Sequence, residues 1–350
     1  MSRVALITGG NGITGSAILE HLVNNTTAKE WSRIIVTSRS PFQTTVCDDR
    51  ISFIPLDFSE PSNIVAQKMR SECSSVTHAY FSSYIHKDEF TELNRANEAL
   101  FENFLDALIA VAPNLENCTL QTGGKYYNVH LGPVPSPARE DLPRIESPIG
   151  NFYFQQEDHL FKRQKDQKWT WNVNRPEAII GYTSKPNGMN SALTFALYFM
   201  VCKELGAEAS MPTNQTYFNG YDAVSDSRLI ADLTIYASTH EKFSSTQVFA
   251  KESPVEGILQ LEFRLAEWVK DKREVWDRIC DKAGMPTAKA TWDAGTWAFQ
   301  DRVFQRTWYA TLSISKARKF GWTGYVDSYD SFRHAFEKLK ELKQILNVEL

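Results

Sequence analysis

Residues 4–15, VALITGGNGITG, carry a short apolar run into a glycine-rich turn and then into a helical pattern. This order is typical of the first strand, turn and helix of a dinucleotide-binding fold. Gly9 permits the tight turn, Gly12 lets the backbone approach a pyrophosphate, and Gly15 lets the helix pack against the strand. The pyrophosphate would lie over the helix N-terminus, where free N–H groups and the helix dipole favour negative charge. We therefore predict a cofactor turn whose binding residues are Gly9, Asn11, Gly12, Ile13 and Gly15.

The rest of the first half repeats this alternation of strand and helix patterns. Short runs rich in β-branched or aromatic residues predict strands at 34–37, 51–56, 77–82, 117–122 and 169–174. Helical patterns cover 12–24, 61–73 and 89–112. Because strands that alternate with helices pair in parallel through right-handed crossovers, we predict an α/β Rossmann fold with a doubly wound parallel sheet over residues 1–180.

The alternation weakens beyond about residue 181. Helical patterns in this part cover 190–205, 226–237, 255–270 and 330–346. No internal repeat or low-complexity linker separates the two halves of the sequence. We therefore predict a smaller, mainly helical substrate-binding or lid region over 181–350, which packs against the first domain and is interleaved with it.

The end of the second strand indicates which dinucleotide is bound. It reads Thr37-Ser38-Arg39-Ser40, with no acidic residue to hold the two ribose hydroxyls of NAD(H). A guanidinium and a hydroxyl suit a 2′-phosphate, so Ser38 and Arg39 favour NADP(H). Asp57, after the third strand, is placed to contact the adenine. Further cofactor contacts are predicted from Phe58, Ser82, Thr122 and Gly123.

The composition narrows the class of protein. The 350 residues have a formal net charge of -4, which gives no electrostatic reason to expect nucleic acid or an anionic membrane as a partner. The longest apolar stretch, 192–201, is about half as long as a bilayer span. The five cysteines are scattered and the seven histidines form no ligand pair, so we predict neither disulfides nor a metal site. We expect a soluble cytoplasmic protein.

The candidate catalytic residues depart from the usual pattern of short-chain dehydrogenases, which carry Tyr-x-x-x-Lys on a helix after the fifth strand. Here Tyr153 is followed four residues later by Glu157, and the serine usual at the end of the fifth strand is missing. Lys125 stands where that strand ends, at the mouth of the predicted cleft. A lysine close to a tyrosine favours the phenolate and lowers the pKa of the tyrosine. From position alone, Tyr153 could equally be a core residue and Lys125 an exposed loop lysine.

Several longer motifs are more specific than the glycine turn. They are QTGGKYY at 121–127, EDLPR at 140–144, NFYF at 151–154 and WNVNRP at 171–176. These motifs resemble the progesterone 5β-reductase/iridoid synthase-like (PRISE-like) family of extended short-chain dehydrogenases/reductases. The resemblance covers nearly the whole chain.

The resemblance implies an NADPH-dependent reductase that saturates the C=C bond of an enone or enal. The family's catalytic tyrosine and lysine fall on Tyr153 and Lys125, and Tyr153 would also lie beside the cofactor. After the family's Arg-Pro pair, the nicotinamide would be held by Pro176, Ile179 and Ile180. The resemblance also favours a homodimer.

Three departures from the family pattern affect these expectations. Phe154 stands where many members have a second tyrosine, which leaves Tyr153 as the catalytic one. Ser38 stands where plant members have the first of two arginines, which weakens the preference for NADP(H) without removing it. The loop at 126–131 is longer than in the plant enzymes, so the shape of the substrate pocket is not predicted by the resemblance.

The expected reaction is hydride transfer to the β-carbon of the substrate, with the enolate oxygen stabilised by Tyr153 and Lys125. The C-terminal aromatic residues suit either a wall over an apolar substrate or ordinary helix packing; they are Trp297, Phe299, Phe304, Trp308 and Tyr309. We predict that the substrate pocket is lined by Tyr126, Met189, Phe218, Trp297 and Phe299.

Three other functions stay open on sequence grounds. A 1,2-reduction of a ketone or aldehyde is disfavoured by the missing serine. An NADP(H)-sensing protein would keep the glycine turn without needing Tyr153 or Lys125. A nonredox cyclase or isomerase could bind a reactive enol in the same pocket.

Overall fold

The structure, a computed structural model, describes residues 2–240 and 259–347. Its first elements are β1 (Arg3–Ile7), α1 (Ile13–Asn25) and β2 (Trp31–Ser38). The apolar residues of β1 are buried because this strand lies in the middle of the sheet. It pairs in parallel with β2 on one side and with β4 (His78–Phe81) on the other.

The main sheet has six parallel strands in the order β3-β2-β1-β4-β5-β6. The remaining strands are β3 (Ile51–Pro55), β5 (Asn117–Gln121) and β6 (Thr170–Asn174). The chain moves outward from β1 to β3 and then returns to place β4 on the other side of β1. This topology confirms the predicted doubly wound sheet, and the reversal of strand order opens a crevice at the carboxyl ends of β1 and β4.

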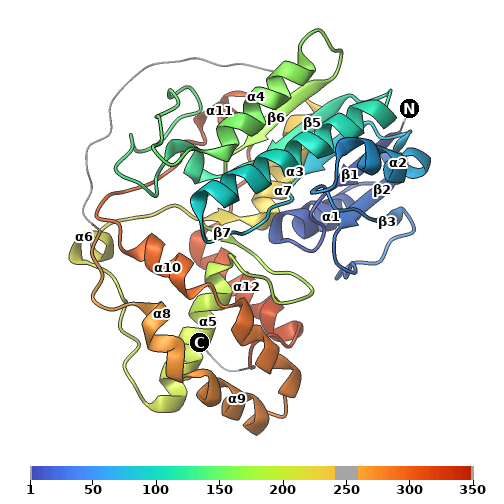
Figure 1. The fold of residues 1–350 in the computed structure, drawn as a ribbon. Coiled ribbons are helices and arrows are strands. Elements are labelled where there is room, and N and C mark those ends of the chain that lie inside the picture. The colour runs from blue at the N-terminus through green and yellow to red at the C-terminus, as the bar shows by residue number, and fades with distance from the viewer. Residues whose placement is uncertain (1, 241–258, 348–350) are drawn as a thin grey trace.

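Helices cover both faces of the sheet (Figure 1). Those on one face are α2 (Ser62–Cys73), α3 (Phe90–Val111) and α4 (Phe152–Gln164). They bury a core that includes Phe81, Phe101 and Phe104. On the other face α1 packs beside α7 (Ser227–Thr239), where Ile18 and Ile235 share a second core. The second half of the chain therefore contributes a helix to the sheet unit of the first half.

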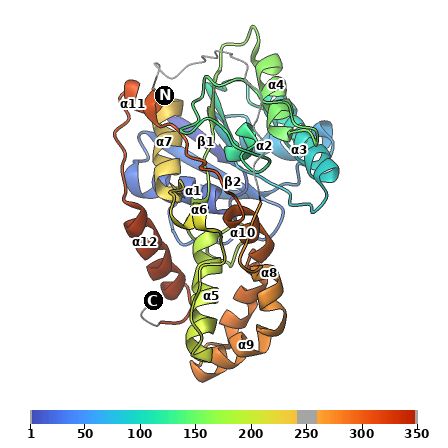
Figure 2. The same cartoon turned by 90° about the vertical axis from the view of Figure 1, so that its left-hand side faces the viewer.

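The second half is otherwise a group of helices and short turns. Its remaining α-helices are α5 (Ser191–Leu205), α6 (Gln215–Phe218), α8 (Leu265–Trp268), α9 (Arg273–Lys282), α10 (Trp297–Phe304), α11 (Ser315–Lys319) and α12 (Ser328–Glu341). The short 3-10 helices are η1 (Gly124–Tyr127), η3 (Val269–Asp271) and η4 (Pro286–Ala294). Figure 2 shows α5, α8 and α9 gathered at the end of the molecule away from the sheet. A parallel pair, β7 (Ile179–Ile180) with β8 (Ser225–Asp226), lies between the two groups.

Two predicted helices differ from the structure. Of the helix predicted at 255–270, residues 255–258 lie outside the described part, and the chain becomes helical only at Leu265. The Asp301 carboxylate accepts hydrogen bonds from the N–H groups of Leu265 and Ala266 at 2.7 and 3.0 Å, which starts the helix there. The helix predicted at 330–346 ends at Glu341, because Lys343 adopts a left-handed φ of 55°.

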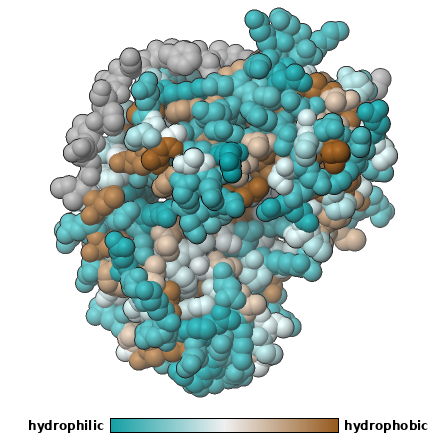
Figure 3. Space-filling model, viewed as in Figure 1, coloured by the Kyte–Doolittle hydropathy of each residue, from teal (hydrophilic) through white to brown (hydrophobic). Residues whose placement is uncertain are grey.

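The apolar residues outside the sheet unit are used mainly for packing. Those of α5 are buried in the helical core, together with Trp276 of α9. Among the helices that the structure describes, none is long and apolar enough to cross a membrane. On the face drawn in Figure 3, apolar residues (brown) form small patches among hydrophilic ones.

Candidate active site

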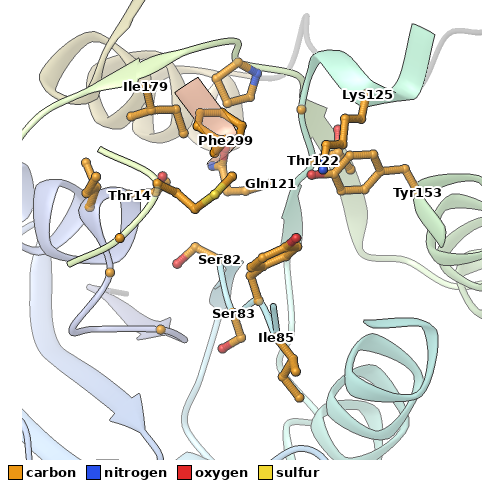
Figure 4. A pocket seen from close by; sticks show the side chains of 18 of the residues that line it. Thr14, Ser82, Ser83, Ile85, Gln121, Thr122, Lys125, Tyr153, Ile179 and Phe299 are labelled. Atoms are coloured by element: carbon orange, nitrogen blue, oxygen red, sulfur yellow. The ribbon is translucent and has the colours of Figure 1, made fainter. Parts of the chain in front are cut away.

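A cavity of about 1030 Å³ lies at the carboxyl ends of the strands, where the strand order reverses. Its walls come from the turn after β1, the ends of β2, β4 and β5, the segment after β6, and α10 (Figure 4). The predicted site residues that line it are Gly9, Asn11, Gly12, Ile13, Ser38, Arg39, Asp57, Phe58, Ser82, Thr122, Gly123, Lys125, Tyr153, Pro176, Ile179, Met189 and Phe299.

The glycine turn has the shape that a pyrophosphate needs. Gly9 has a left-handed φ of +66°, and a Cβ there would lie 2.8 Å from the carbonyl oxygen of Ser82. No side chain caps α1 at Gly12 and no acid lies in its first turn, so the free N–H groups are open to an anion. A Cβ at Gly15 would collide with the carbonyl oxygen of Gly9, so Gly15 lets the helix pack beneath the turn and does not itself line the cavity. The turn therefore fits the phosphates of a dinucleotide.

The end of β2 fits a phosphate on the cofactor ribose. Arg39 is exposed at the cavity and forms no ion pair with any residue that the structure describes. Asn11 donates from Nδ2 to Ser38 Oγ at 3.1 Å and to Ser40 Oγ at 2.9 Å. These hydrogen bonds join the glycine turn to the loop that carries Arg39. The turn that would hold the pyrophosphate and the loop that would hold the ribose phosphate are thus fixed to each other.

Tyr153 and Lys125 are brought to the same cavity by the start of α4. The Asn151 side chain caps this helix by accepting the N–H of Tyr153 at 3.2 Å, and its Nδ2 donates to the carbonyl oxygen of Lys125 at 2.8 Å. One side chain therefore ties the helix that carries Tyr153 to the turn that carries Lys125. Gly123 leaves room for the phenol, because a Cβ there would lie 3.2 Å from the Tyr153 hydroxyl oxygen.

The protonation of Tyr153 differs from the expectation drawn from sequence. Burial raises the pKa of Tyr153 above its usual range, and the nearby Tyr84 raises it further. The expected lowering of this pKa by Lys125 is therefore wrong, because the cost of burying a phenolate is larger than any gain from the lysine. Burial, helped by the positive charge of Arg302, lowers the pKa of Lys125. At neutral pH the cavity presents a protonated phenol.

Glu157 has a structural role. It stands four residues after Tyr153, at the position where other short-chain dehydrogenases carry a lysine. Glu157 is fully buried, and its carboxylate accepts from Arg175 Nη2 at 2.7 Å and from Arg144 Nη2 at 3.3 Å. The Arg175 guanidinium lies over the ring of Tyr126, 3.5 Å from its centroid. Tyr126 is thereby held in the protein interior, and the expectation that it lines the substrate pocket does not hold.

Three other predicted site residues lie outside the cavity. Ile180 is buried in a small core, whereas its neighbour Ile179 lines the cavity, because successive residues of a strand point to opposite sides. Trp297 packs against Trp292 in the helical core with their ring centroids 5.1 Å apart. Phe218 is 66% exposed on the short helix α6.

Of the C-terminal aromatic residues, Phe299 lines the cavity and the others pack elsewhere. Phe304 is buried in the helical core. Trp308 donates from Nε1 to the carbonyl oxygen of Val129 at 3.0 Å, and Tyr309 stacks on Tyr221 with a centroid distance of 4.7 Å. Helix and loop packing is therefore the role of most of this aromatic group.

Several polar side chains that line the cavity were missed in the sequence. They are Gln121, His130, Gln156, Glu177, Arg302 and Arg306. Glu177 directly follows the Arg-Pro pair, so a charge next to a cofactor motif was a signal that could have been used. The two arginines come from α10 and the residues after it, and no local pattern connects them to the glycine turn. Within residues 2–240 and 259–347, no cluster of three or more His, Cys, Asp and Glu side chains could hold a metal ion.

Comparison with known proteins gives the family. The PRISE-like Rossmann-fold domain matches residues 5–253. The short chain dehydrogenase gsfE of Penicillium aethiopicum is 53% identical, over 98% of this chain and 99% of its own length. The (S)-8-oxocitronellyl enol synthase ISY1 of Nepeta racemosa is 32% identical, over 97% of this chain and 92% of its own. The 3-oxo-Delta(4,5)-steroid 5-beta-reductase of Arabidopsis thaliana is 30% identical, with the same two coverages of 97% and 92%.

Solved structures share the fold at much lower identity. Gre2 from Candida albicans, in complex with NADPH, has a TM-score of 0.56 at 13% identity and covers 97% of this chain and 99% of its own. The Bordetella bronchiseptica enzyme WbmH, in complex with NAD+, has a TM-score of 0.60 at 14% identity, with the same coverages of 97% and 99%. The chain therefore belongs to the PRISE-like Rossmann-fold family, and it is an oxidoreductase of the short-chain dehydrogenase class that takes a nicotinamide cofactor.

Proposed function

We propose that this protein is an NADPH-dependent enone reductase, which saturates the C=C bond of a small apolar α,β-unsaturated carbonyl compound. The observation that carries the proposal is the buried, protonated Tyr153 beside Gly123, with Lys125 in the same cavity. One relative, the 3-oxo-Delta(4,5)-steroid 5-beta-reductase of Arabidopsis thaliana, is named for a reduction of this kind, which supports the proposed chemistry.

The cavity has two ends that suit the two halves of the cofactor. The glycine turn and Arg39 would hold its phosphates. Pro176 and Ile179 line the other end, and the Pro176 carbonyl oxygen lies 3.4 Å from where a Gly123 Cβ would be. That end also contains Tyr153, so the reacting carbons of a substrate would lie there. When bound, NADPH supplies a hydride to the β-carbon of the acceptor.

Tyr153 would act on the carbonyl oxygen of the substrate, where negative charge develops as the β-carbon is reduced. Because burial keeps the phenol protonated, Tyr153 can donate a hydrogen bond to this oxygen. Lys125 adds a positive charge from the same cavity. A donor that is already oriented toward a developing oxyanion contributes about 3–4 kcal/mol to the stability of a transition state.

A 1,2-reduction of the carbonyl group is less well supported. Ordinary short-chain dehydrogenases use a serine near the end of the fifth strand. Here Thr122 follows β5, and its hydroxyl donates to the carbonyl oxygen of Asn174 at 3.0 Å. Its proton is thereby directed to the protein backbone and away from a substrate alkoxide.

The test is oxidation of NADPH with a panel of enones and enals, with identification of the products, for the wild type and Tyr153→Phe. We expect a saturated carbonyl product and a loss of about 100-fold or more in kcat for Tyr153→Phe. Tyr325→Phe is the matched control, because this tyrosine is 76% exposed and does not line the cavity.

The other outcomes select the other functions. An allylic alcohol as product would establish 1,2-reduction. Binding of NADPH without turnover of any acceptor would favour the sensing role, and conversion of a reactive enol without NADPH consumption would favour the nonredox role.

A further inference from the structure

The cavity carries more positive charge than the proposed reaction needs. The lysine and arginine side chains of the described chain that line it are Arg39, Lys125, Arg302 and Arg306. Arg39 is assigned to the cofactor phosphate and Lys125 to the developing oxyanion. Arg306 is 4% exposed, and two carboxylates pair with it, those of Glu177 and Asp222. Arg302, in contrast, is exposed at the cavity and forms no ion pair with any residue that the structure describes.

The chain that follows Arg302 is fixed beside the turn that carries Lys125. Arg306, four residues after Arg302, donates from Nη1 to Glu177 Oε1 at 3.2 Å. The carboxyl group of Glu177 packs against Gly124, because a Cβ there would lie 3.1 Å from Glu177 Cδ. Gly124 directly precedes Lys125 in the turn. The ion pair therefore joins the chain after α10 to the place where Lys125 enters the cavity.

Two further contacts place Arg302 at the same end of the cavity. Trp308 donates from Nε1 to the carbonyl oxygen of Val129 at 3.0 Å, and the residue after Val129, His130, lines the cavity. Phe299 stands three residues before Arg302, on the same face of α10, and also lines the cavity (Figure 4). The side chain of Arg302 therefore lies at the end of the cavity that contains the catalytic pair.

The electrostatics of this end agree with the geometry. Burial and the charge of Arg302 both lower the pKa of Lys125. Burial lowers the pKa of His130 to about 4, helped by both cations, so this imidazole is neutral near pH 7. The acids of the described chain that line the cavity, Asp57 and Glu177, form no ion pair with Lys125 or Arg302. Two cations that repel each other favour an anionic ligand, because an anion between them is attracted by both.

We propose that Arg302 binds a carboxylate of the substrate, so that the preferred acceptor is an enone with one anionic substituent on an otherwise apolar body. This inference rests on the enone reductase function proposed above and narrows its substrate class. A guanidinium suits the role, because its planar fork can hold a carboxylate through two parallel hydrogen bonds. Arg302 would thus determine specificity, while Tyr153 and Lys125 act on the carbonyl oxygen.

The test compares substrates that differ only in charge. Each pair is a cyclohex-2-en-1-one with a chain of two to four carbons at C3, which ends either in a carboxylate or in the primary amide. For the best chain length we expect the wild type to prefer the carboxylate by about 10- to 100-fold in kcat/KM, the worth of a charge-assisted hydrogen bond. We expect Arg302→Gln to lose this preference and to keep its kcat/KM for the amide within about twofold.

Two control variants separate the contact from a general effect of charge. Arg302→Lys keeps the charge without the planar fork and should keep part of the preference. Arg95 is exposed on α3 and does not line the cavity, so Arg95→Gln makes the same change of net charge and should keep all of it. If Arg95→Gln loses as much as Arg302→Gln, the preference comes from the net charge of the protein, and the inference is overturned.

Binding of the saturated products gives a readout that does not depend on turnover. In the complex with NADP+, calorimetry should show tighter binding of the saturated carboxylate than of its amide to the wild type, and no such difference in Arg302→Gln. The difference should shrink as salt is added, because an exposed ion pair is screened. Selective binding of the carboxylate without reduction of any enone would overturn the proposed function and leave the Arg302 site standing. Equal reduction of carboxylate and amide at every chain length would overturn this inference alone.

Discussion

Arg39 is the residue on which the choice of cofactor depends. Its guanidinium is exposed at the cavity and has no ion-pair partner in the described part of the chain, so it is available to a 2′-phosphate. We predict that Arg39→Gln lowers the preference for NADPH over NADH by about 10- to 100-fold, the worth of one charge-assisted hydrogen bond. Dissociation constants for both cofactors, measured by fluorescence titration, give the ratio.

A matched arginine separates a local contact from a general charge effect. Arg70 is also exposed but does not line the cavity, so Arg70→Gln should leave the ratio unchanged. An unchanged ratio in Arg39→Gln would mean that the 2′-phosphate is held elsewhere.

At the same scale, the catalytic pair shows what a sequence can and cannot predict. The motifs around residues 121–127 and 151–154 identified Lys125 and Tyr153, and the structure places both in one cavity. The direction of the Tyr153 pKa was not predictable, because it depends on how far the ring is buried. The place of Glu177 in the cavity could have been predicted from the Arg-Pro pair that precedes it, but its desolvation could not, since that depends on how the chain packs around the carboxyl group.

At the scale of elements, α4 explains why the usual lysine is absent after Tyr153. Glu157 in this helix is fully buried between Arg175 and Arg144. We predict that Glu157→Lys, which restores the Tyr-x-x-x-Lys spacing, destabilises the protein by about 3–5 kcal/mol, since it replaces the buried anion between Arg175 and Arg144 with a third cation. The free energy of unfolding in urea measures this loss.

The neighbouring Asp158 provides the control. Its side chain is 61% exposed and pairs with the same Arg144 at 2.7 Å. Asp158→Lys makes the same change of charge at the surface and should cost less than about 1 kcal/mol. Equal losses in the two variants would show that Glu157 matters only through the net charge of the helix.

Elements with a strong local pattern were the ones that the sequence predicted. The alternation of strand and helix patterns indicated all six strands of the sheet, because β-branched and aromatic residues are enriched in strands. The start of α8 was not predictable, since its cap is Asp301, 36 residues further along the chain. The same limit applies to Trp297 and Phe299, whose directions depend on how α10 packs.

At the scale of the whole molecule, the cavity is made by segments that are far apart in the sequence. The glycine turn lies near the N-terminus, Phe299 and Arg302 come from α10, and α7 closes the opposite face of the sheet. The hydroxyl of Thr234 in α7 accepts from Gln121 Nε2 and from Asn174 Nδ2, both at 2.8 Å. The helical half is therefore hydrogen-bonded directly to the strands whose ends form the site. For this reason we expect ligand binding to stabilise both halves of the molecule together.

This coupling leads to a prediction about thermal stability. A ligand at 100 times its dissociation constant stabilises the native state by about 2.7 kcal/mol. For a chain of 350 residues this corresponds to a rise in Tm of about 3–5 °C with NADPH. We predict that Gly15→Ala abolishes the rise, because a Cβ there would collide with the Gly9 carbonyl oxygen and distort the turn. Ser16→Ala, one residue further along α1, should keep it, and a full rise in Gly15→Ala would show that the phosphates bind away from this turn.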